Sequence, residues 1–387
     1  MCIRDRLRVG LHARGRLLVD DDIAVTGPVV ERTFPLGDGG FDDRFALVWW
    51  PASPTLIDAE MTLHSGGVEL DRIASYTALR SVDVSHGQVR INGRPYPLRL
   101  VLDQGYWPDT GATPPDVDAL ERDIRLTRAL GFNGARKHQK VEDLRYYALC
   151  DRLGLLCWVE MPSAYRPGPR TAARLFEEWG EVVRAHVNHP SVIAWVPLNE
   201  SWGVPACETE PTQRRLVTAL CDVAHALDGT RPVSANDGWE TIGGEIVGVH
   251  DYDQDPAVLA ARWGTDAAVD RSLAGRRSDG RLADLEQRPA DGRAVILSEF
   301  GGVALATDTG ENPTVFGTAN WGYDNAESAE ELLHRYRAQW AVVHASDLAG
   351  ACWTQLTDTY QEVNGLLTMD RVPKVDAARI EAATRGR

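Results

Sequence analysis

Residues 194–203 read AWVPLNESWG, and this stretch decides how the chain is interpreted. Its first half is an apolar run suited to a buried strand. The run ends abruptly in Asn199 and Glu200, with Trp195 and Trp202 on either side. A buried strand that ends on an amide and a carboxylate predicts a polar site at that end of the strand.

Similar apolar runs recur along the chain from residue 88 onward and alternate with helix-like segments. The runs that predict strands are residues 98–103, 131–136, 155–160, 192–198, 232–236, 246–250, 294–299 and 348–353. The amphipathic segments that predict helices are residues 117–130, 141–153, 172–187, 212–227 and 329–344. Residues 262–293 form a polar insertion, which we interpret as a surface loop with a short helix. Eight strands alternating with helices predict a (β/α)8 TIM barrel over residues 88–387.

The first 87 residues have a different pattern, without any segment of helical period. Short β-prone runs, separated by Gly, Pro and Asp residues, occupy residues 16–19, 29–34, 45–50, 56–64 and 75–84. This spacing predicts a small β-sandwich domain over residues 1–87. The dipeptide Asn92-Gly93, which lies between two apolar runs just after it, predicts a tight hairpin.

Composition excludes several classes of protein. The formal net charge of -15 argues against nucleic-acid binding, because an acidic surface repels phosphates. The sequence has no run of 18 apolar residues, so we expect no membrane span. The N-terminal residues MCIRDRLRVG are too charged for a secretion signal. They begin in the middle of a β pattern, so an upstream start of the chain with its own signal is left open. The cysteines are scattered, which predicts reduced thiols in a cytoplasmic protein; they are Cys2, Cys150, Cys157, Cys207, Cys221 and Cys352.

The predicted barrel would gather the residues at its strand ends. In a (β/α)8 barrel the chemistry sits at the C-terminal ends of the strands. Those ends are polar, rich in carboxylates and aromatic here. The candidates at or just beyond them are Asp103, Trp107, Arg136, His138, Glu160, Asn199, Glu200, Trp202, His250, Tyr252, Glu299 and Trp353, with Asn236 and Asp237 ending the fifth strand.

Glu200 and Glu299 stand out because their strands are otherwise apolar. They are 99 residues apart, which is three βα units, so a closed barrel places them opposite each other over one mouth. Retaining glycoside hydrolysis needs two carboxyl groups about 5 to 5.5 Å apart, one as nucleophile and one as acid and base. The nucleophile must stay ionised, which a nearby Arg136 favours. The acid must keep its proton, which an apolar wall and a neighbouring negative charge favour.

Each candidate also has a structural interpretation. An Asn-Glu pair is expected by chance about once in a chain of this length, and strand ends are usually solvated. Arg136 and Glu160 suit an ordinary ion pair, and a histidine at a strand end is as often a satisfied polar residue as a ligand. Trp353 suits a capping core aromatic, although sugars favour indole faces. The pairing of Glu200 with Glu299 favours the catalytic interpretation.

Several segments in order resemble glycoside hydrolase family 2. The resemblance runs from about residue 49 to residue 371 through WWPASPTLIDAEM, VRINGRPYPLR, GFNGARKHQKVED, CDRLGLLCWVEMPS, NHPSVIAWVPLNESWG, ILSEFGG and TQLTDTYQEVNGLLTMDR. It implies that Glu200 is the general acid/base and Glu299 the nucleophile. It also implies that Asn199 hydrogen-bonds the sugar 2-hydroxyl, that Arg136 lies beside the nucleophile, and that residues 1–87 are an immunoglobulin-like sandwich.

The chain departs from the pattern of this family in two respects. It lacks the jelly-roll domain that normally precedes the sandwich, which implies a chain truncated at its N-terminus. Family members that act on glucuronides carry an Asn-x-Lys motif, and none of Lys137, Lys140 and Lys374 has an asparagine two places before it. The resemblance therefore argues against a β-glucuronidase.

We predict a retaining exo-β-glycosidase, with β-galactosidase as the first substrate assignment because it is the commonest remaining activity. The alternatives are a β-mannosidase or another β-hexosidase on the same scaffold, and a carbohydrate-binding protein without turnover. Intact Glu200 and Glu299 speak against the last. The predicted partner is a β-glycoside; no metal or other cofactor is expected, and a homo-oligomer is left open. The long stretch after the seventh strand, residues 301–327, contains Trp321, which could offer a sugar platform.

Overall fold

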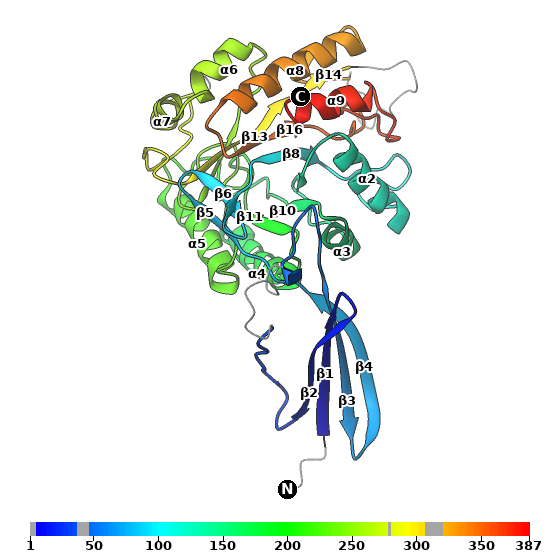
Figure 1. The fold of residues 1–387 in the computed structure, drawn as a ribbon. Coiled ribbons are helices and arrows are strands. Elements are labelled where there is room, and N and C mark those ends of the chain that lie inside the picture. Colours follow the sequence, from blue (N-terminus) through cyan, green and yellow to red (C-terminus); the bar gives the residue numbers. More distant parts are fainter. Residues whose placement is uncertain (1–4, 37–45, 278–279, 306–319) are drawn as a thin grey trace. The chain divides into compact units, whose positions relative to one another are not determined.

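The computed structural model describes residues 5–36, 46–277, 280–305 and 320–387. The chain divides into two compact units (Figure 1). Unit 1 comprises Met1–Arg80, Asp151–Gly154 and Asn188–Pro190, and unit 2 comprises Ser81–Cys150, Leu155–Val187 and Ser191–Arg387. A search of the described residues finds no helix with the length and apolar character needed to cross a membrane.

Unit 1 contains one antiparallel sheet with the strand order β2-β1-β3-β4. Along β1, the residues Val9, Leu11 and Ala13 are buried while their neighbours are more exposed, which is the period of two expected when one face of a sheet is covered. These side chains pack with Leu47 and Ile57 in a small core. The strands are β1 (Asp5–Ala13), β2 (Arg16–Ala24), β3 (Ile57–Ser65) and β4 (Val68–Thr77).

The predicted sandwich is only partly matched by this unit. Residues 16–19 and 56–64 lie in or overlap β2 and β3, as predicted, but the described residues form one sheet and not two packed sheets. Residues 29–34 form no strand, so that prediction was wrong. Pro28 and Pro35 flank the segment, and proline offers no N–H group to a ladder. An immunoglobulin-like domain over residues 1–87 therefore stays a prediction.

Unit 2 is built on a parallel sheet with the strand order β11-β10-β9-β8-β16-β13-β12. Almost every residue of these strands is buried, because helices cover one face and the barrel interior the other. The strands are β8 (Leu98–Asp103), β9 (Gly134–Lys137), β10 (Leu156–Glu160), β11 (Val192–Val196), β12 (Ile246–His250), β13 (Ala294–Gly301) and β16 (Gly350–Thr354). Seven of the eight predicted strands are thus confirmed.

The fifth predicted strand, residues 232–236, closes the ring without forming a regular strand. Val233 forms an isolated bridge with Trp195 of β11, and Ser234 forms one with Ile246 of β12. The ladder is interrupted because Pro232 has no N–H group and because the Asn236 side chain bonds locally to the carbonyl oxygen of Glu240. The segment nevertheless joins the two edges of the sheet, so the barrel is closed.

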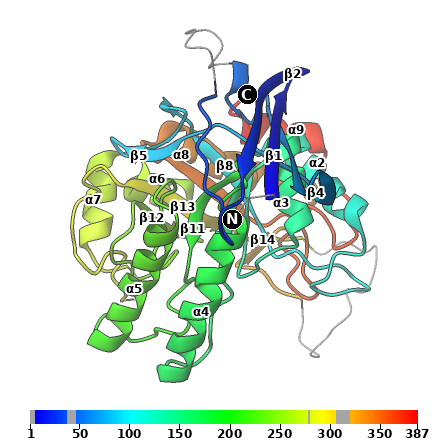
Figure 2. The ribbon, with the colours of Figure 1, turned by 90° about the horizontal axis from the view of Figure 1, so that it is seen from below.

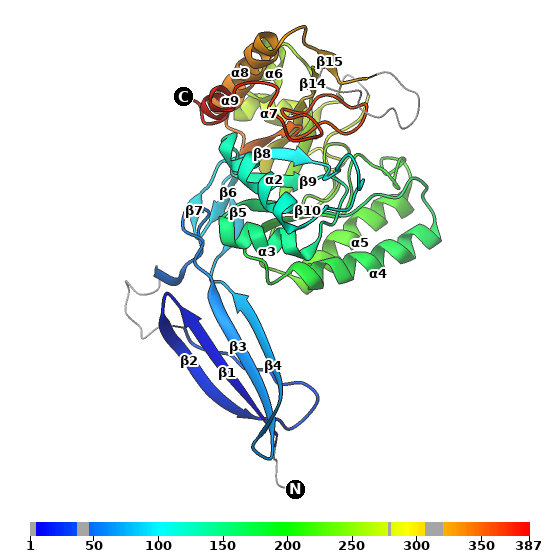
Figure 3. The ribbon, with the colours of Figure 1, turned by 90° about the vertical axis from the view of Figure 1, so that its right-hand side faces the viewer.

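The helices follow the predicted pattern, and their ends have ordinary causes. The five predicted helices are confirmed with ends that differ by at most three residues, and α4 and α5 lie side by side (Figures 2 and 3). Side chains at Asp116, Thr265 and Ser328 accept backbone N–H groups at the first turns. The helices are α2 (Val117–Ala129), α3 (Leu144–Leu153), α4 (Pro169–His186), α5 (Pro211–Leu227), α6 (Pro256–Trp263), α7 (Asp266–Ala274), α8 (Ala329–Ala345) and α9 (Ala377–Thr384). The predicted insertion at residues 262–293 thus contains α7 and the end of α6.

Smaller elements complete unit 2. The predicted hairpin joins β6 to β7, and its turn residues Asn92 and Gly93 have φ values of 51° and 73°, as a type I′ turn requires. The five cysteines among the described residues are buried and free, in agreement with the prediction of reduced thiols. The boundary predicted at residues 87–88 stays a prediction. The short strands are β5 (Val82–Ser85), β6 (Gln88–Ile91), β7 (Arg94–Pro95), β14 (Val303–Ala304) and β15 (Asp324–Asn325).

Candidate active site

Glu200 and Glu299 come together at the carboxyl ends of the barrel strands, as predicted. One oxygen of each carboxylate and one ring nitrogen of His250 lie within 4.8 Å of one another. Glu299 lies near the end of β13, and Glu200 follows β11. The separation is in the short range typical of retaining glycosidases, and an inverting pair would be farther apart.

The backbone at Glu200 is held in an unusual conformation. Glu200 and Ser201 have φ values of 49° and 54°, in the left-handed region that non-glycine residues seldom adopt. The fifth strand segment holds them there: the N–H of Glu200 donates to the carbonyl oxygen of Asp237 at 2.9 Å, and that of Ser201 to Asn236 Oδ1 at 2.9 Å. Strained residues of this kind cluster at functional sites. The irregular fifth segment therefore sets the direction of the Glu200 side chain.

Arg136 is the centre of a buried ion-pair network that joins four strand ends. Its side chain is fully buried, and Nε donates to Glu160 Oε2 at 2.6 Å. Nη2 donates to Asn199 Oδ1 at 2.6 Å, and Nη1 lies 2.9 Å from both Glu299 Oε1 and Asp237 Oδ2. Burial acts to lower the pKa of Arg136, but the three carboxylates outweigh it and raise the pKa. Arg136 therefore stays charged beside Glu299.

His250 links the two candidate catalytic residues to Asp237. Its Nδ1 lies 2.8 Å from Glu200 Oε1, and its Nε2 lies 3.0 Å from Asp237 Oδ2 and 3.3 Å from Glu299 Oε1. Burial opposes the charged imidazolium, yet the charge of Glu299 and the hydrogen bonds to Asp237 and Glu200 raise the pKa of His250 to about 9. At neutral pH His250 is therefore a charged imidazolium, with a proton on each ring nitrogen.

The protonation of Glu200 differs from the sequence-based expectation. Burial raises the pKa of Glu200, but the hydrogen bond with His250 and the charges of His250, His138 and Arg136 outweigh burial and lower it. The expected effect of burial on Glu200 is thus present, but the three cations reverse it. In the resting site Glu200 is a carboxylate, and the proton it would need as an acid lies on His250, across a 2.8 Å hydrogen bond.

Raising the pH is expected to destabilise the protein through His250. Its pKa lies above the ordinary value of 6.5, so its contribution is fully present below pH 6.5 and is lost as the pH rises to about 9. We expect the free energy of unfolding of the wild type to fall, relative to that of His250→Gln, by up to about 3 kcal/mol over this interval. Urea unfolding at pH 6 and pH 9.5 measures this difference. His334→Gln, which replaces an exposed histidine of α8, should follow the wild type. Parallel pH dependence in wild type and His250→Gln would contradict the assignment.

Asp237 is a site residue that the sequence did not single out, although it was noted at the end of the fifth strand. It is fully buried, and its carboxylate contacts both Arg136 and His250. Burial raises its pKa, but those two cations outweigh burial and lower it, so Asp237 is ionised. Gly248 leaves room for it, since a Cβ there would lie 1.9 Å from Asp237 Oδ1. The glycine within the apolar run IVGVH was the available signal of a close approach.

Tyr252 holds the other side of the Glu299 carboxylate. Its hydroxyl donates to Glu299 Oε2, while Oε1 accepts from Arg136. The Tyr252 ring stacks on Tyr323, with the ring centroids 3.4 Å apart. Burial and the charge of Glu299 raise the pKa of Tyr252, so it remains a hydrogen-bond donor. Both oxygens of Glu299 are thus fixed by donors.

Three further predicted residues lie in the same network. Glu160 is fully buried and also accepts the backbone N–H of Gln139 at 2.8 Å, which agrees with its structural interpretation as the partner of Arg136. His138 Nδ1 lies 3.3 Å from Glu160 and 3.7 Å from Glu299. The buried Nδ2 of Asn199 has no hydrogen-bond partner among the described residues. It is therefore free to donate to a bound molecule.

The remaining predicted residues have no direct contact with the two carboxylates among the described interactions. Asp103 binds Lys137 Nζ at 2.6 Å, and Trp107 is buried with the Lys140 ammonium 4.9 Å from its ring centroid. Trp202 is 41% exposed and packs edge-on against another aromatic ring. Their roles in substrate binding stay predictions.

Trp353 lies at the end of β16 and is buried. Its ring packs edge-on against Phe300, with centroids 5.1 Å apart, and a Cβ at Gly301 would lie 2.5 Å from it. Its Nε1 has no hydrogen-bond partner within the described part of the chain. Trp321, on the loop after β13, is 40% exposed. Stacking of either ring on a sugar stays a prediction.

The same site contains a set of side chains that could ligate a metal ion. Glu200, His250 and Glu299 each offer one ligand atom. A histidine binds a metal through a neutral ring nitrogen, so His250 would first have to lose its proton. The chemistry of this donor set therefore fits proton transfer better than metal binding.

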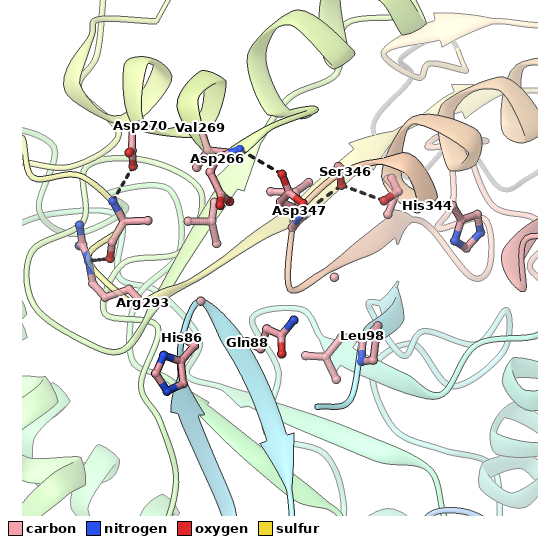
Figure 4. A pocket seen from close by; sticks show the side chains of 18 of the residues that line it. His86, Gln88, Leu98, Asp266, Val269, Asp270, Arg293, His344, Ser346 and Asp347 are labelled. Carbon is pink, nitrogen blue, oxygen red and sulfur yellow. Dashed lines mark hydrogen bonds between the residues drawn. The ribbon is translucent and has the colours of Figure 1, made fainter. Parts of the chain in front are cut away.

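A cavity of about 710 Å³ lies at the opposite ends of the strands (Figure 4). It is lined by the first residues of β8 and β16, Leu98 and Gly350, and by charged side chains that include Asp270 and Arg293. The candidate catalytic residues do not line it. They lie instead at the carboxyl ends of the strands.

Part of the barrel is similar to known proteins. Residues 82–255 match the TIM barrel domain of glycosyl hydrolases family 2. A β-galactosidase of Vibrio vulnificus is 29% identical over 163 residues, which are 40% of this chain and 16% of that protein. A putative β-glucuronidase of Formosa agariphila is 28% identical over 214 residues, which are 52% of this chain and 25% of that protein.

Among solved structures, the β-glucuronidase of Bacteroides uniformis superposes with a TM-score of 0.74 at 20% identity. The superposition covers 98% of this chain and 46% of that one, and it shows a shared fold. The predicted resemblance is thus confirmed for the barrel domain, and the homologues are glycosidases. The chain spans only 16% to 25% of the length of the two curated relatives described above.

Proposed function

We propose that this chain carries the catalytic site of a retaining exo-β-glycosidase, with Glu299 as nucleophile and Glu200 as acid and base. The observation that carries this proposal is the short separation of the two carboxylates, whose oxygens lie within 4.8 Å of each other at one end of the barrel. The match of residues 82–255 to a glycosyl hydrolase barrel supports it. Binding alone would require neither carboxylate.

In the first step Glu299 attacks the anomeric carbon and forms a covalent glycosyl ester, while the bond to the leaving oxygen breaks. Arg136 and Tyr252 hold the carboxylate oriented for attack. Glu200 gives a proton to the leaving oxygen. Because His250 carries that proton in the resting site, it must pass from Nδ1 to Glu200 Oε1 along their hydrogen bond before or during bond cleavage.

In the second step Glu200 acts as a base. It takes a proton from water as the water oxygen attacks the anomeric carbon, and the ester bond to Glu299 breaks. Two inversions at one carbon leave the β-configuration unchanged. The free Nδ2 of Asn199 faces no protein acceptor and is suited to donate to a hydroxyl of the sugar next to the reacting carbon.

For the substrate, we place a β-galactoside first. Several of the related proteins are named β-galactosidases, and the sequence lacks the Asn-x-Lys motif expected of enzymes that act on glucuronides. β-Mannosides and other β-hexosides remain the second candidates. A carbohydrate-binding protein without turnover is the remaining alternative, against which the intact pair Glu200 and Glu299 counts.

Covalent trapping tests the mechanism directly. A 2-deoxy-2-fluoro glycoside with a dinitrophenolate leaving group should inactivate the enzyme and label one peptide, since the fluorine slows both steps and the activated leaving group speeds only the first. A panel of nitrophenyl β-galactoside, β-glucoside, β-mannoside and β-xyloside first identifies the sugar to use. We expect the label on Glu299. A label on any other residue would contradict the assignment. If the folded protein hydrolyses no substrate of the panel, the alternative of a carbohydrate-binding protein without turnover would be favoured.

A further inference from the structure

A second polar cluster lies at the same end of the barrel as Glu200 and Glu299. We call it the Glu362 cluster; it consists of Gln104, Gln355, Glu362 and Asn364. Gln104 directly follows β8 and Gln355 directly follows β16, and these two strands are paired. Glu362 and Asn364 come from the segment after β16, where the N–H of Gln355 donates to the carbonyl oxygen of Asn364 at 3.3 Å. The cluster therefore sits above the first and eighth strands.

Amide groups hold the Glu362 carboxylate in place. Gln104 Nε2 donates to Glu362 Oε2 at 2.9 Å, and Asn364 Nδ2 donates to Oε1 at 3.2 Å. Gln355 fixes both amides, since its Oε1 accepts from Gln104 at 3.0 Å and its Nε2 donates to Asn364 Oδ1 at 2.7 Å. Each carboxylate oxygen thus has one amide donor and can accept at least one more hydrogen bond.

Glu362 differs from the other acidic residues of the site because no cation neutralises it directly. Glu160, Asp237 and Glu299 all form ion pairs with Arg136. Within the described part of the chain Glu362 forms none, and its partners are neutral amides. Burial and the charge of Glu299 raise its pKa, although the two amide bonds and His138 counteract them. A carboxylate held without a counterion, yet partly exposed, suits contact with a neutral ligand.

Ring and backbone contacts link the cluster to the catalytic pair. The charges of Glu299 and His138 act on Glu362, and Glu299, Glu200 and Glu362 all contribute to raising the pKa of Tyr323. Tyr323 stacks on the ring of Tyr252, whose hydroxyl donates to Glu299. Trp321, two residues before it, forms a backbone bridge with Glu362. The segment of Trp321 and Tyr323 therefore connects Glu362 with the residue that holds Glu299.

We propose that Glu362 is a specificity-determining residue, which accepts hydrogen bonds from the hydroxyl groups of a neutral β-hexoside and repels β-uronides. This inference rests on the proposed glycosidase function and narrows its substrate class. A uronide would bring its own carboxylate to a mouth that already holds one unpaired carboxylate, and like charges in a site of low dielectric repel strongly.

The available cations do not reverse this preference. Arg136 is fully buried and bonded to acceptors on four strand ends. Lys137 is bound to Asp103 and Glu142. Lys140 lies 2.9 Å from Glu142, and the partly exposed His138 lies 3.3 Å from Glu160. A uronate would have to displace one of these internal partners to gain an ion pair, whereas a neutral hydroxyl needs only the free acceptor capacity of Glu362.

The test compares matched pairs of substrates. Nitrophenyl β-galactoside and β-galacturonide form one pair, and β-glucoside and β-glucuronide form the other. We expect the wild type to hydrolyse the neutral member faster. Glu362→Gln removes the charge at nearly constant size, and we expect the ratio of kcat/KM for the neutral member to that for the uronide to fall at least about tenfold. Glu362→Asp keeps the charge and should keep the wild-type preference. Glu330→Gln, at an exposed position of α8, should not change the ratio.

A binding measurement separates this inference from the proposed function. Equilibrium affinities for galactose and galacturonate are measured with the same three variants. If no substrate is turned over but the wild type prefers galactose and Glu362→Gln loses that preference, the glycosidase proposal fails and the role of Glu362 stands. A wild type that prefers uronides, or a preference that Glu362→Gln leaves unchanged in both rate and affinity, would overturn the role of Glu362.

Discussion

Glu299→Gln is expected to lower kcat on the best nitrophenyl glycoside on the order of 10⁵-fold, because an amide does not form the glycosyl ester. The substitution is nearly isosteric. The amide oxygen can still accept from Arg136 Nη1, which lies 2.9 Å from Glu299 Oε1. Loss of turnover would therefore reflect the missing nucleophile and not a collapsed site. Steady-state kinetics on freshly purified enzyme, combined with the trapping reagent, measures both the rate and the absence of a label.

The control for this prediction is Glu121→Gln. Glu121 lies on α2 and forms an exposed ion pair with Arg125, so its replacement should leave kcat unchanged. Urea unfolding of both variants checks that each is folded. If Glu299→Gln kept more than about a hundredth of the wild-type rate after contamination was excluded, another group would have to be the nucleophile.

Much of the barrel could be predicted from local pattern, because its strands are buried on both faces and are therefore apolar throughout. Such runs are visible without any knowledge of their partners, as β8 and β12 show, whose predicted bounds match the structure. The segment 232–236 did not become a regular strand because Pro232 and the local bonds of Asn236 interrupt its ladder, which depends on its neighbours in space. In unit 1 the strands are half exposed, and their sheet partners follow from contacts distant in sequence.

The catalytic pair could be predicted for a similar reason. A carboxylate at the end of an apolar strand is rare enough to be noticed in the sequence, and barrel topology then brings two of them together. The state of their protons could not be predicted. It depends on His250 and Asp237, which lie on different strand segments and meet Glu200 only in the folded barrel. Burial raises the pKa of Glu200 as expected, but the contact with His250 and the nearby cations, which are distant in sequence, lower it further than burial raises it.

Glu200→Ala is expected to make the rate depend strongly on the leaving group. Without an acid, an alkoxide leaving group must depart unprotonated, and we expect a loss of about 10²- to 10⁴-fold for an alkyl β-glycoside such as a disaccharide. A dinitrophenolate needs no proton, so its departure should be little affected, and hydrolysis of the glycosyl ester becomes the slow step. A burst of dinitrophenol equal to the enzyme concentration, followed by slow turnover, would report this accumulation.

Azide then tests the second role of the same residue. The truncated side chain leaves space beside His250, whose imidazolium offers Nδ1 to a small anion in place of Glu200 Oε1. Azide needs no base, so it should attack the anomeric carbon, break the ester to Glu299 and release a β-glycosyl azide. We expect turnover of the dinitrophenyl glycoside by Glu200→Ala to rise with azide concentration, while the wild type and Glu299→Gln do not respond. An α-glycosyl azide, or equal loss of rate for good and poor leaving groups, would contradict the assignment of acid and base to Glu200, because each outcome requires a different group to face the leaving oxygen.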